Sequence, residues 1–115
     1  MVDVQRLRSE FQSLYGSTPM VFSAPGRVNL IGEHTDYNDG FVLPMAIERR
    51  TYVAAAANGT SKVRVRSATL NQSFELDLDQ PGPKRRGVFL DYIEGTARGL
   101  LDRGLPVVGT DLLID

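Results

Sequence analysis

The chain has 115 residues, with 13 basic and 14 acidic side chains and a formal net charge of -1. These charges are interspersed, so the sequence offers no basic stripe for nucleic acid or for an anionic membrane. The absence of cysteine excludes disulfide frameworks, thiolate zinc sites and cysteine nucleophiles. No apolar run has the length of a membrane span or of a secretory signal, and we therefore expect a cytoplasmic protein.

The first predicted element is an amphipathic helix over Asp3–Tyr15. Its apolar residues recur at helical spacing, at Val4, Leu7, Phe11 and Leu14. Gly16 and Pro19 follow and end the helix. Met20–Phe22 then has the character of a strand, which we expect to stop where the glycine-rich segment Ala24–Gly40 begins.

The middle of the chain predicts a sheet. Residues 41–47 and 51–57 are expected to be two strands, and the dipeptide Asn58-Gly59 is suited to a tight hairpin turn. That turn makes 62–67 the expected partner of 51–57. Basic residues alternate with valine along 62–67, and acidic residues alternate with apolar ones along 74–79. The opposite charges suggest that these last two strands are neighbours.

A second helix is predicted over Val88–Arg103 and a final strand over Val107–Ile114. The apolar face expected for the helix comprises Phe89, Tyr92, Ile93, Ala97, Leu100 and Leu101. Gly95 and Gly99 lie within it, and each costs about 1 kcal/mol relative to alanine, so we expect a closely approaching neighbour there. The whole pattern indicates an α+β fold, a mostly antiparallel sheet with helices packed on it.

The glycine-rich segment holds the residues best suited to chemistry. Glu33, His34 and Asp36 place two carboxylates and the single imidazole of the chain within four residues. Carboxylates and an imidazole can bind the hydroxyls of a sugar. Three other interpretations remain open for this triplet. The first is a metal site, although the spacing of the three residues is unfavourable for metal ligands. The second is the acid–base pair of a glycosidase, although such pairs normally come from separate elements. The third is an ordinary turn, because the same residue types form turns.

The length of one match favours the sugar interpretation. Residues 26–37, Gly-Arg-Val-Asn-Leu-Ile-Gly-Glu-His-Thr-Asp-Tyr, resemble the galactokinase signature of the GHMP small-molecule kinases. The residues on both sides, Ala24-Pro25 and 38–44, fit it as well. The wider chain also resembles the start of that family, including the Tyr-x-x-Gly step at Tyr92–Gly95. Phe89 stands where the family commonly has tryptophan. Its candidate role in stacking near the nucleotide is therefore the weakest of the roles that the resemblance implies.

The resemblance implies specific roles. Glu33, His34, Thr35 and Asp36 would line the galactose site. Arg27 would lie beside the transferring phosphoryl group as a transition-state stabiliser, because a planar guanidinium can meet two phosphoryl oxygens at once. The alternative for Arg27 is an ion pair that only holds the signature loop.

The resemblance also implies what this sequence lacks. The ATP-binding loop, the Mg²⁺ ligands and the second domain of the family are expected beyond Asp115. We therefore expect residues 1–115 to be the N-terminal portion of the N-terminal GHMP kinase domain, inactive alone, with no metal ligands of its own. The parent would be a monomeric galactokinase acting on galactose and ATP. The alternatives are a catalytically silent galactose sensor, or a kinase for N-acetylgalactosamine or arabinose.

Overall fold

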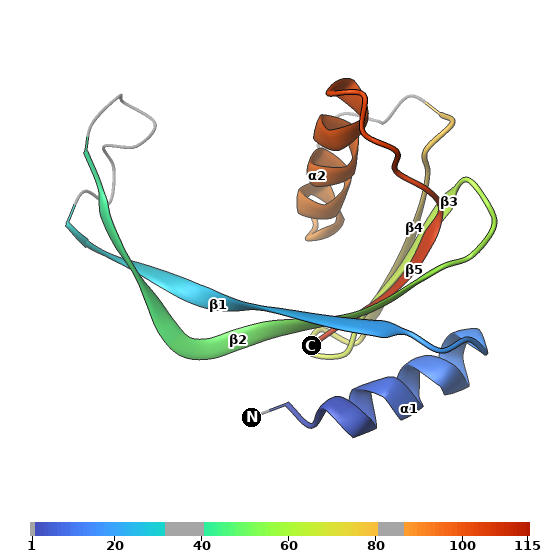
Figure 1. Ribbon diagram of the computed structural model, residues 1–115, viewed down its shortest axis with the longest axis horizontal. Helices are drawn as coiled ribbons and strands as arrows, with labels where there is room; N and C mark the ends of the chain where they lie inside the picture. Colours follow the sequence, from blue (N-terminus) through green and yellow to red (C-terminus); the bar gives the residue numbers. More distant parts are fainter. Residues whose placement is uncertain (1, 32–40, 81–86) are drawn as a thin grey trace.

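A computed structural model describes residues 2–31, 41–80 and 87–115, and these form two helices and a five-stranded sheet of order β1-β2-β5-β3-β4 (Figure 1). The elements are α1 Val4–Tyr15, β1 Met20–Ile31, β2 Leu43–Ala57, β3 Lys62–Ser67, β4 Gln72–Asp77, α2 Leu90–Asp102 and β5 Thr110–Ile114. Among these strands only β3 and β5 pair in parallel. The predicted α+β class with a mostly antiparallel sheet is therefore confirmed.

The predicted N-terminal helix forms, and its ends follow from local chemistry. The Asp3 carboxylate accepts hydrogen bonds from the backbone N–H groups of Gln5 at 3.0 Å and Arg6 at 3.3 Å, which caps the first turn. Gly16 ends the helix with a left-handed backbone, φ 77°. The buried face of α1 packs on β2 and β5, in a core cluster of Leu7, Phe11, Ala54 and Leu113.

The predicted hairpin between residues 51–57 and 62–67 is wrong. β5 lies between β2 and β3, antiparallel to the first and parallel to the second. The connection through Asn58-Gly59 therefore crosses over the end of β5 to reach β3. The backbone N–H of Asn58 donates to the Gly109 carbonyl at 3.1 Å. Gly109 fits closely there, because a Cβ at this position would lie 2.0 Å from the Thr60 carbonyl oxygen. A local turn signal cannot reveal a strand inserted from a distant part of the chain.

The two predicted breaks in the first sheet strands are also wrong. β1 continues past Ala24 to Ile31, and β2 is one strand rather than two. The pairing register shifts between Pro25 and Arg27, so an irregularity in the ladder accommodates the Pro-Gly dipeptide. Gly26 has a close neighbour, since a Cβ there would lie 3.0 Å from Ile47 Cδ1.

Helix α2 covers the face of the sheet opposite α1 (Figure 1). Leu90 packs there with three buried residues of the strands, Val63, Val65 and Leu76. Arg98 fastens the helix to the end of β4. Its guanidinium donates to the carbonyl oxygens of Leu78 at 3.4 Å and Gln80 at 2.6 Å, and to Glu94 Oε2 at 3.2 Å.

The predicted apolar face of this helix is only partly correct. Tyr92 is 82% exposed, whereas Glu94, a turn away from Leu90, is 8% exposed. The charged pair Glu94–Arg98 thus lies toward the sheet, a rotation that apolar periodicity alone does not predict. No neighbour in the described part of the chain lies within 4 Å of a Cβ built at Gly95 or Gly99, so the expected close contact is not found there.

The charge pattern did predict one strand pairing. β3 and β4 are antiparallel neighbours, with Lys62 opposite Asp77 and Arg64 opposite Glu75. A diagonal ion pair joins Lys62 Nζ to Glu75 Oε1 at 3.2 Å.

Candidate functional site

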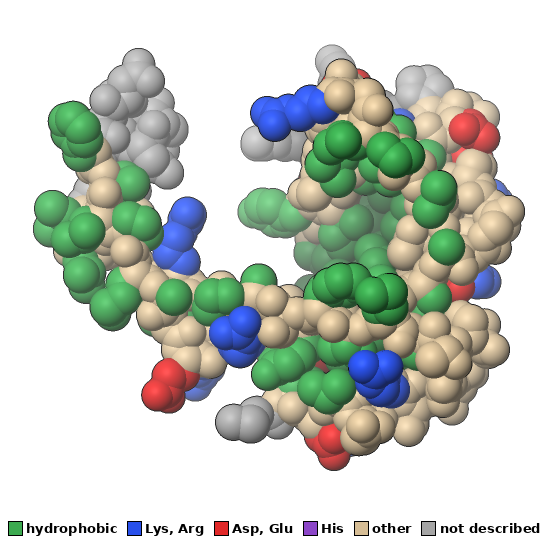
Figure 2. All heavy atoms as spheres, viewed as in Figure 1, with side chains coloured by type: hydrophobic (Ala, Val, Ile, Leu, Met, Phe, Trp, Pro, Cys, Tyr) green, Lys and Arg blue, Asp and Glu red, His purple; other side chains and the backbone are tan. Residues whose placement is uncertain are grey.

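The site residues predicted from the sequence belong to a projecting part of the sheet. β2 pairs with β5 only over Val53–Ala57, and beyond that point β1 and β2 continue together as a two-stranded ribbon. We call residues 24–31 of β1 and 43–50 of β2 the arm. The arm curves away from the rest of the sheet (Figure 1). Figure 2 shows a hollow between the arm on one side and α2 on the other.

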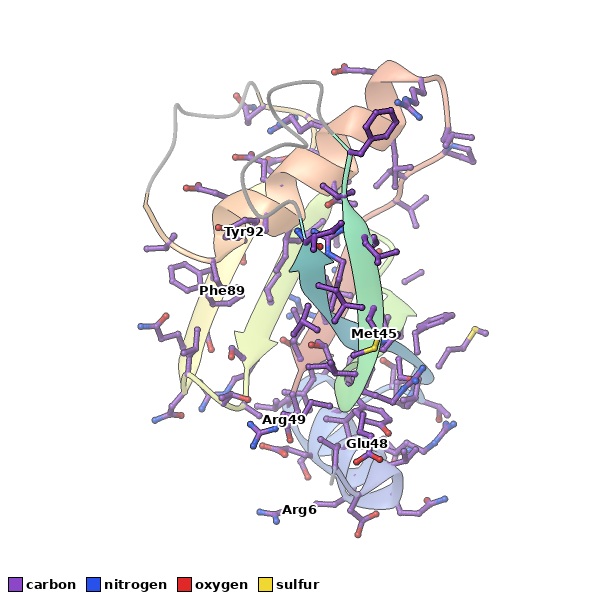
Figure 3. The ribbon with its side chains drawn as sticks, turned by 90° about the vertical axis from the view of Figure 1, so that its left-hand side faces the viewer. Arg6, Met45, Glu48, Arg49, Phe89 and Tyr92 are labelled. Atoms are coloured by element: carbon purple, nitrogen blue, oxygen red, sulfur yellow. The ribbon has the colours of Figure 1, made fainter. Side chains whose placement is uncertain are left out.

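Arg27 lies on the arm, on β1 and opposite Ala46 of β2. Its neighbour Val28 is opposite Met45, and Figure 3 shows Met45 on the outer side of the arm. Because successive strand residues point to opposite faces, Arg27 is on the side that faces the hollow. Arg27 is exposed, and no hydrogen bond or ion pair joins its guanidinium to another residue in the described ranges.

The predicted sugar-binding residues Glu33, His34, Thr35 and Asp36 lie outside the described residues. The structure does fix the two chain positions that flank them. Ile31 of β1 is paired with Leu43 of β2, so the signature segment leaves and re-enters the sheet at one end of the arm. This is also the part of the sheet to which Arg27 belongs.

Phe89, the predicted nucleotide-stacking candidate, precedes the first turn of α2 (Figure 3). It is half-buried and packs edge-on against Phe74, with ring centroids 5.1 Å apart and an interplanar angle of 82°. The Phe89 ring is thus in contact with the hydrophobic core on one side. α2 and the arm form the two walls of the hollow, so Phe89 and Arg27 belong to elements on its opposite sides.

A separate cavity of about 860 Å³ lies on the α1 side of the sheet. Its charged lining residues are Asp3, Arg6, Glu10, Glu48, Arg49, Arg50 and Asp115. Figure 3 shows Arg6, Glu48 and Arg49 in this region. Charges of both signs line the cavity. Arg27 and Phe89 are not among its lining residues.

Sequence reasoning missed the polar cluster that holds β5 in place. Asp111 is buried, and its two carboxylate oxygens each accept a hydrogen bond from the Arg64 guanidinium at 2.6 Å. The Asn58 amide donates to the same carboxylate at 2.9 Å. Arg64 in turn lies 5.2 Å from the ring centre of Tyr15, whose pKa is raised, first by burial and then by the charge of Asp111. The alternation of basic residues and valine along 62–67 did not reveal that Arg64 would pair with a carboxylate on β5.

Two further features are absent from the part of the chain that the structure describes. No three histidine, cysteine, aspartate or glutamate side chains gather there in a way that would hold a metal ion. Neither helix has both the length and the apolar character needed to cross a membrane.

Comparison with known proteins supports the sequence resemblance. A family model described as the galactokinase galactose-binding signature matches residues 9–57. The galactokinase of Chloroflexus aurantiacus is 48% identical over 116 residues, which cover 100% of this chain and 30% of that protein. The galactokinase of a Roseiflexus species is 46% identical over 115 residues, 99% of this chain and 29% of the relative.

This chain is a relative of the galactokinases. It spans about 30% of the length of the curated relatives that it matches. A crystal structure of Lactococcus lactis galactokinase complexed with galactose superposes with a TM-score of 0.81 at 35% identity, covering 96% of this chain and 30% of that one. Methanococcus jannaschii mevalonate kinase shares the fold, with a TM-score of 0.65 at 22% identity over 86% of this chain and 32% of that one. The expected GHMP kinase fold is therefore confirmed.

Proposed function

We propose that residues 1–115 form the N-terminal portion of the N-terminal domain of a galactokinase and supply its sugar-binding signature. The single observation that carries this proposal is the signature match over residues 9–57 in a chain related to galactokinases along its whole length. The complete enzyme is proposed to be cytoplasmic and monomeric. It would transfer the γ-phosphoryl group of ATP to the anomeric hydroxyl of galactose, giving galactose 1-phosphate and ADP.

In this proposal Arg27 stabilises the charge that develops during transfer. A bond forms between the sugar oxygen and the γ-phosphorus, the bond from that phosphorus to the bridging oxygen of ADP breaks, and the hydroxyl proton leaves to a base outside this chain. A guanidinium fixed on a strand can face two phosphoryl oxygens of the transferring group. The exposure of Arg27 on the side of the arm that faces the hollow supports this role.

Glu33, His34, Thr35 and Asp36 are proposed to bind galactose. The carboxylates accept hydrogen bonds from sugar hydroxyls, and charged hydrogen bonds of this kind contribute about 1.5–3 kcal/mol each. Their sequence position between two strands that meet at the end of the arm supports a shared site with Arg27. Phe89 remains a candidate for contact with the nucleotide.

ATP and Mg²⁺ are the partners that a galactokinase requires, and ATP supplies the phosphoryl group. The described residues do not fit a magnesium site, because no carboxylate cluster is found among them. As the family resemblance implies, we assign the ATP loop and the metal ligands to the part of a galactokinase that this chain does not cover. The isolated chain is expected to be inactive.

The proposal is tested in a chimera in which this chain replaces the 116 matched residues of the Chloroflexus aurantiacus galactokinase. Arg27→Ala should lower kcat by on the order of a hundred- to a thousand-fold while KM changes little, because the interaction is strongest in the transition state. Asp36→Ala should instead raise the KM for galactose, with little change for ATP. Arg6→Ala, an exposed arginine on α1, is the control.

Several outcomes would contradict these assignments. A normal kcat in a folded Arg27→Ala chimera would remove the catalytic role, and a lowered melting temperature with both affinities reduced would indicate a loop-holding ion pair. Galactose binding without turnover in the parent chimera would favour the sensor. A preference for N-acetylgalactosamine or arabinose in a substrate panel would change the sugar but not the reaction.

A further inference from the structure

Among the residues that the structure describes, no third strand pairs with the backbone edges of the arm. β1 is an edge strand of the sheet, and residues 43–50 of β2 lie beyond the stretch that pairs with β5. Within the described ranges, the two strands of the arm therefore pair only with each other. A two-stranded ribbon is marginally stable in water unless a further layer covers it. A further layer packed against the arm would therefore stabilise it.

The outer face of the arm has the composition of an interface. Val28 is opposite Met45, and Ile31 is opposite Leu43, so these four side chains share one face. They are 42%, 47%, 65% and 51% exposed, respectively. Figure 2 shows hydrophobic atoms gathered along the outer side of the arm, and Met45 is labelled on that side in Figure 3. A continuous apolar face of this kind marks a binding surface, whereas single exposed apolar residues do not.

The length of the relatives supplies a candidate for the partner of this face. They match the chain over its whole length, arm included, and more than two thirds of each lies outside the match. We propose that the outer face of the arm, defined by Val28, Ile31, Leu43 and Met45, is the docking surface for the remaining part of a galactokinase polypeptide. This inference rests on the proposed function, since it takes its partner from the galactokinases. Docking would add the missing layer and hold Arg27 on the opposite face of the same ribbon.

Hydrogen exchange of the arm's backbone amides tests this proposal directly. The isolated chain is compared with the chimera that carries the rest of the Chloroflexus aurantiacus galactokinase. Amides of residues 28–31 and 43–47 should exchange quickly in the dilute isolated chain and at least about 100-fold more slowly in the chimera, because docking closes the arm. Amides of β3 and β5 should be protected in both samples.

A pair of substitutions gives the test its specificity. Met45→Asp places a charge on the outer face and should abolish most of the added protection in the chimera. Leu70→Asp is the matched control, because Leu70 is similarly exposed at 53% but lies in the turn between β3 and β4. If Met45→Asp prevents recovery of folded chimera, Met45→Ala should give a smaller, graded loss of protection.

The outcomes separate docking from function. Galactose-dependent ADP formation is measured on the same chimera samples. A protected arm in a chimera without this activity would support docking and contradict the proposed function, whereas an open arm in an active chimera would overturn docking alone. A discrete dimer of the isolated chain whose arm is as protected as in the chimera would assign the face to a second copy instead. Equal effects of Met45→Asp and Leu70→Asp would also overturn the proposal.

Discussion

The region formed by β3, β4, β5 and the two helices differs from the arm in having helices packed against the faces of its strands. Both regions carry apolar residues at alternate strand positions. In the first region α1 and α2 cover opposite faces, and residues such as Leu113 and Val65 are buried. In the arm, residues with the same alternation, such as Leu43 and Met45, are exposed. Alternation specifies which residues share a face, but a second layer is needed to bury them.

The largest expected effect compares two leucines of these regions. Leu113 is 0% exposed and Leu43 is 51% exposed. Leu113→Ala should lower the free energy of unfolding by about 2–5 kcal/mol, because it leaves a cavity in the core. Leu43→Ala should change that free energy by about 0.5 kcal/mol or less in the isolated chain. Urea unfolding followed by circular dichroism measures both. In the chimera Leu43→Ala should become costly, and a neutral result there would contradict a docked arm.

A second prediction concerns the polar cluster that fixes β5. Asp111→Ala should lower the free energy of unfolding by about 3 kcal/mol, since it removes charged hydrogen bonds to Arg64 and Asn58. The control is Glu75→Ala, which breaks an ion pair whose two side chains are both half-exposed. Such surface pairs contribute about 0–1 kcal/mol. Equal losses in chemical denaturation of the two variants would mean that Asp111 does not hold the strand.

Gly95 gives a smaller effect whose sign distinguishes two environments. In the described structure a Cβ at Gly95 meets open space. Gly95→Ala should therefore stabilise the isolated chain by about 0.5–1 kcal/mol through helix propensity. If the rest of a galactokinase approaches α2 closely, the same change should destabilise the chimera. The melting temperatures of the unsubstituted and Gly95→Ala proteins are compared, once in the isolated chain and once in the chimera. Stabilisation by Gly95→Ala in the isolated chain and in the chimera would contradict the expected close neighbour.

The smallest expected effect is a pH dependence at the end of β4. The Asp77 carboxylate accepts hydrogen bonds from the Asp79 backbone N–H at 3.0 Å and the Ser61 hydroxyl at 2.9 Å, and these lower its pKa below the ordinary 3.8. A lowered folded pKa means that the stabilisation is present above pH 3.8 and is lost as the pH falls through the folded value. Asp77→Asn should flatten the acid limb of stability against pH. Asp79→Asn is the control, and an unchanged acid limb in Asp77→Asn would refute the assignment.

The sequence was most informative where a signal is local. Helix α1 follows from its periodicity, Asp3 and Gly16, and the β3–β4 pairing follows from opposite charges on adjacent segments. The insertion of β5 could not be predicted, because it depends on the fit of Gly109 against Thr60 and on the buried Asp111, contacts between distant parts of the chain. Likewise, Arg27 was recognised from its motif. Its orientation needed the register of the strands, and the roles of Glu33 and Asp36 stay predictions.

The place of β5 in the sheet has a consequence for the order of folding. β5 is the last described strand along the chain, yet it bridges β2 and β3 near the middle of the sheet. During synthesis, the β1–β2 and β3–β4 pairs can each form early from neighbouring sequence, but they remain separate until residues 110–114 are available. Closure of long loops slows folding, and open strand edges invite misassembly in the meantime. In a chain of this topology, the insertion of β5 should therefore be the step that joins the two hairpins into one sheet.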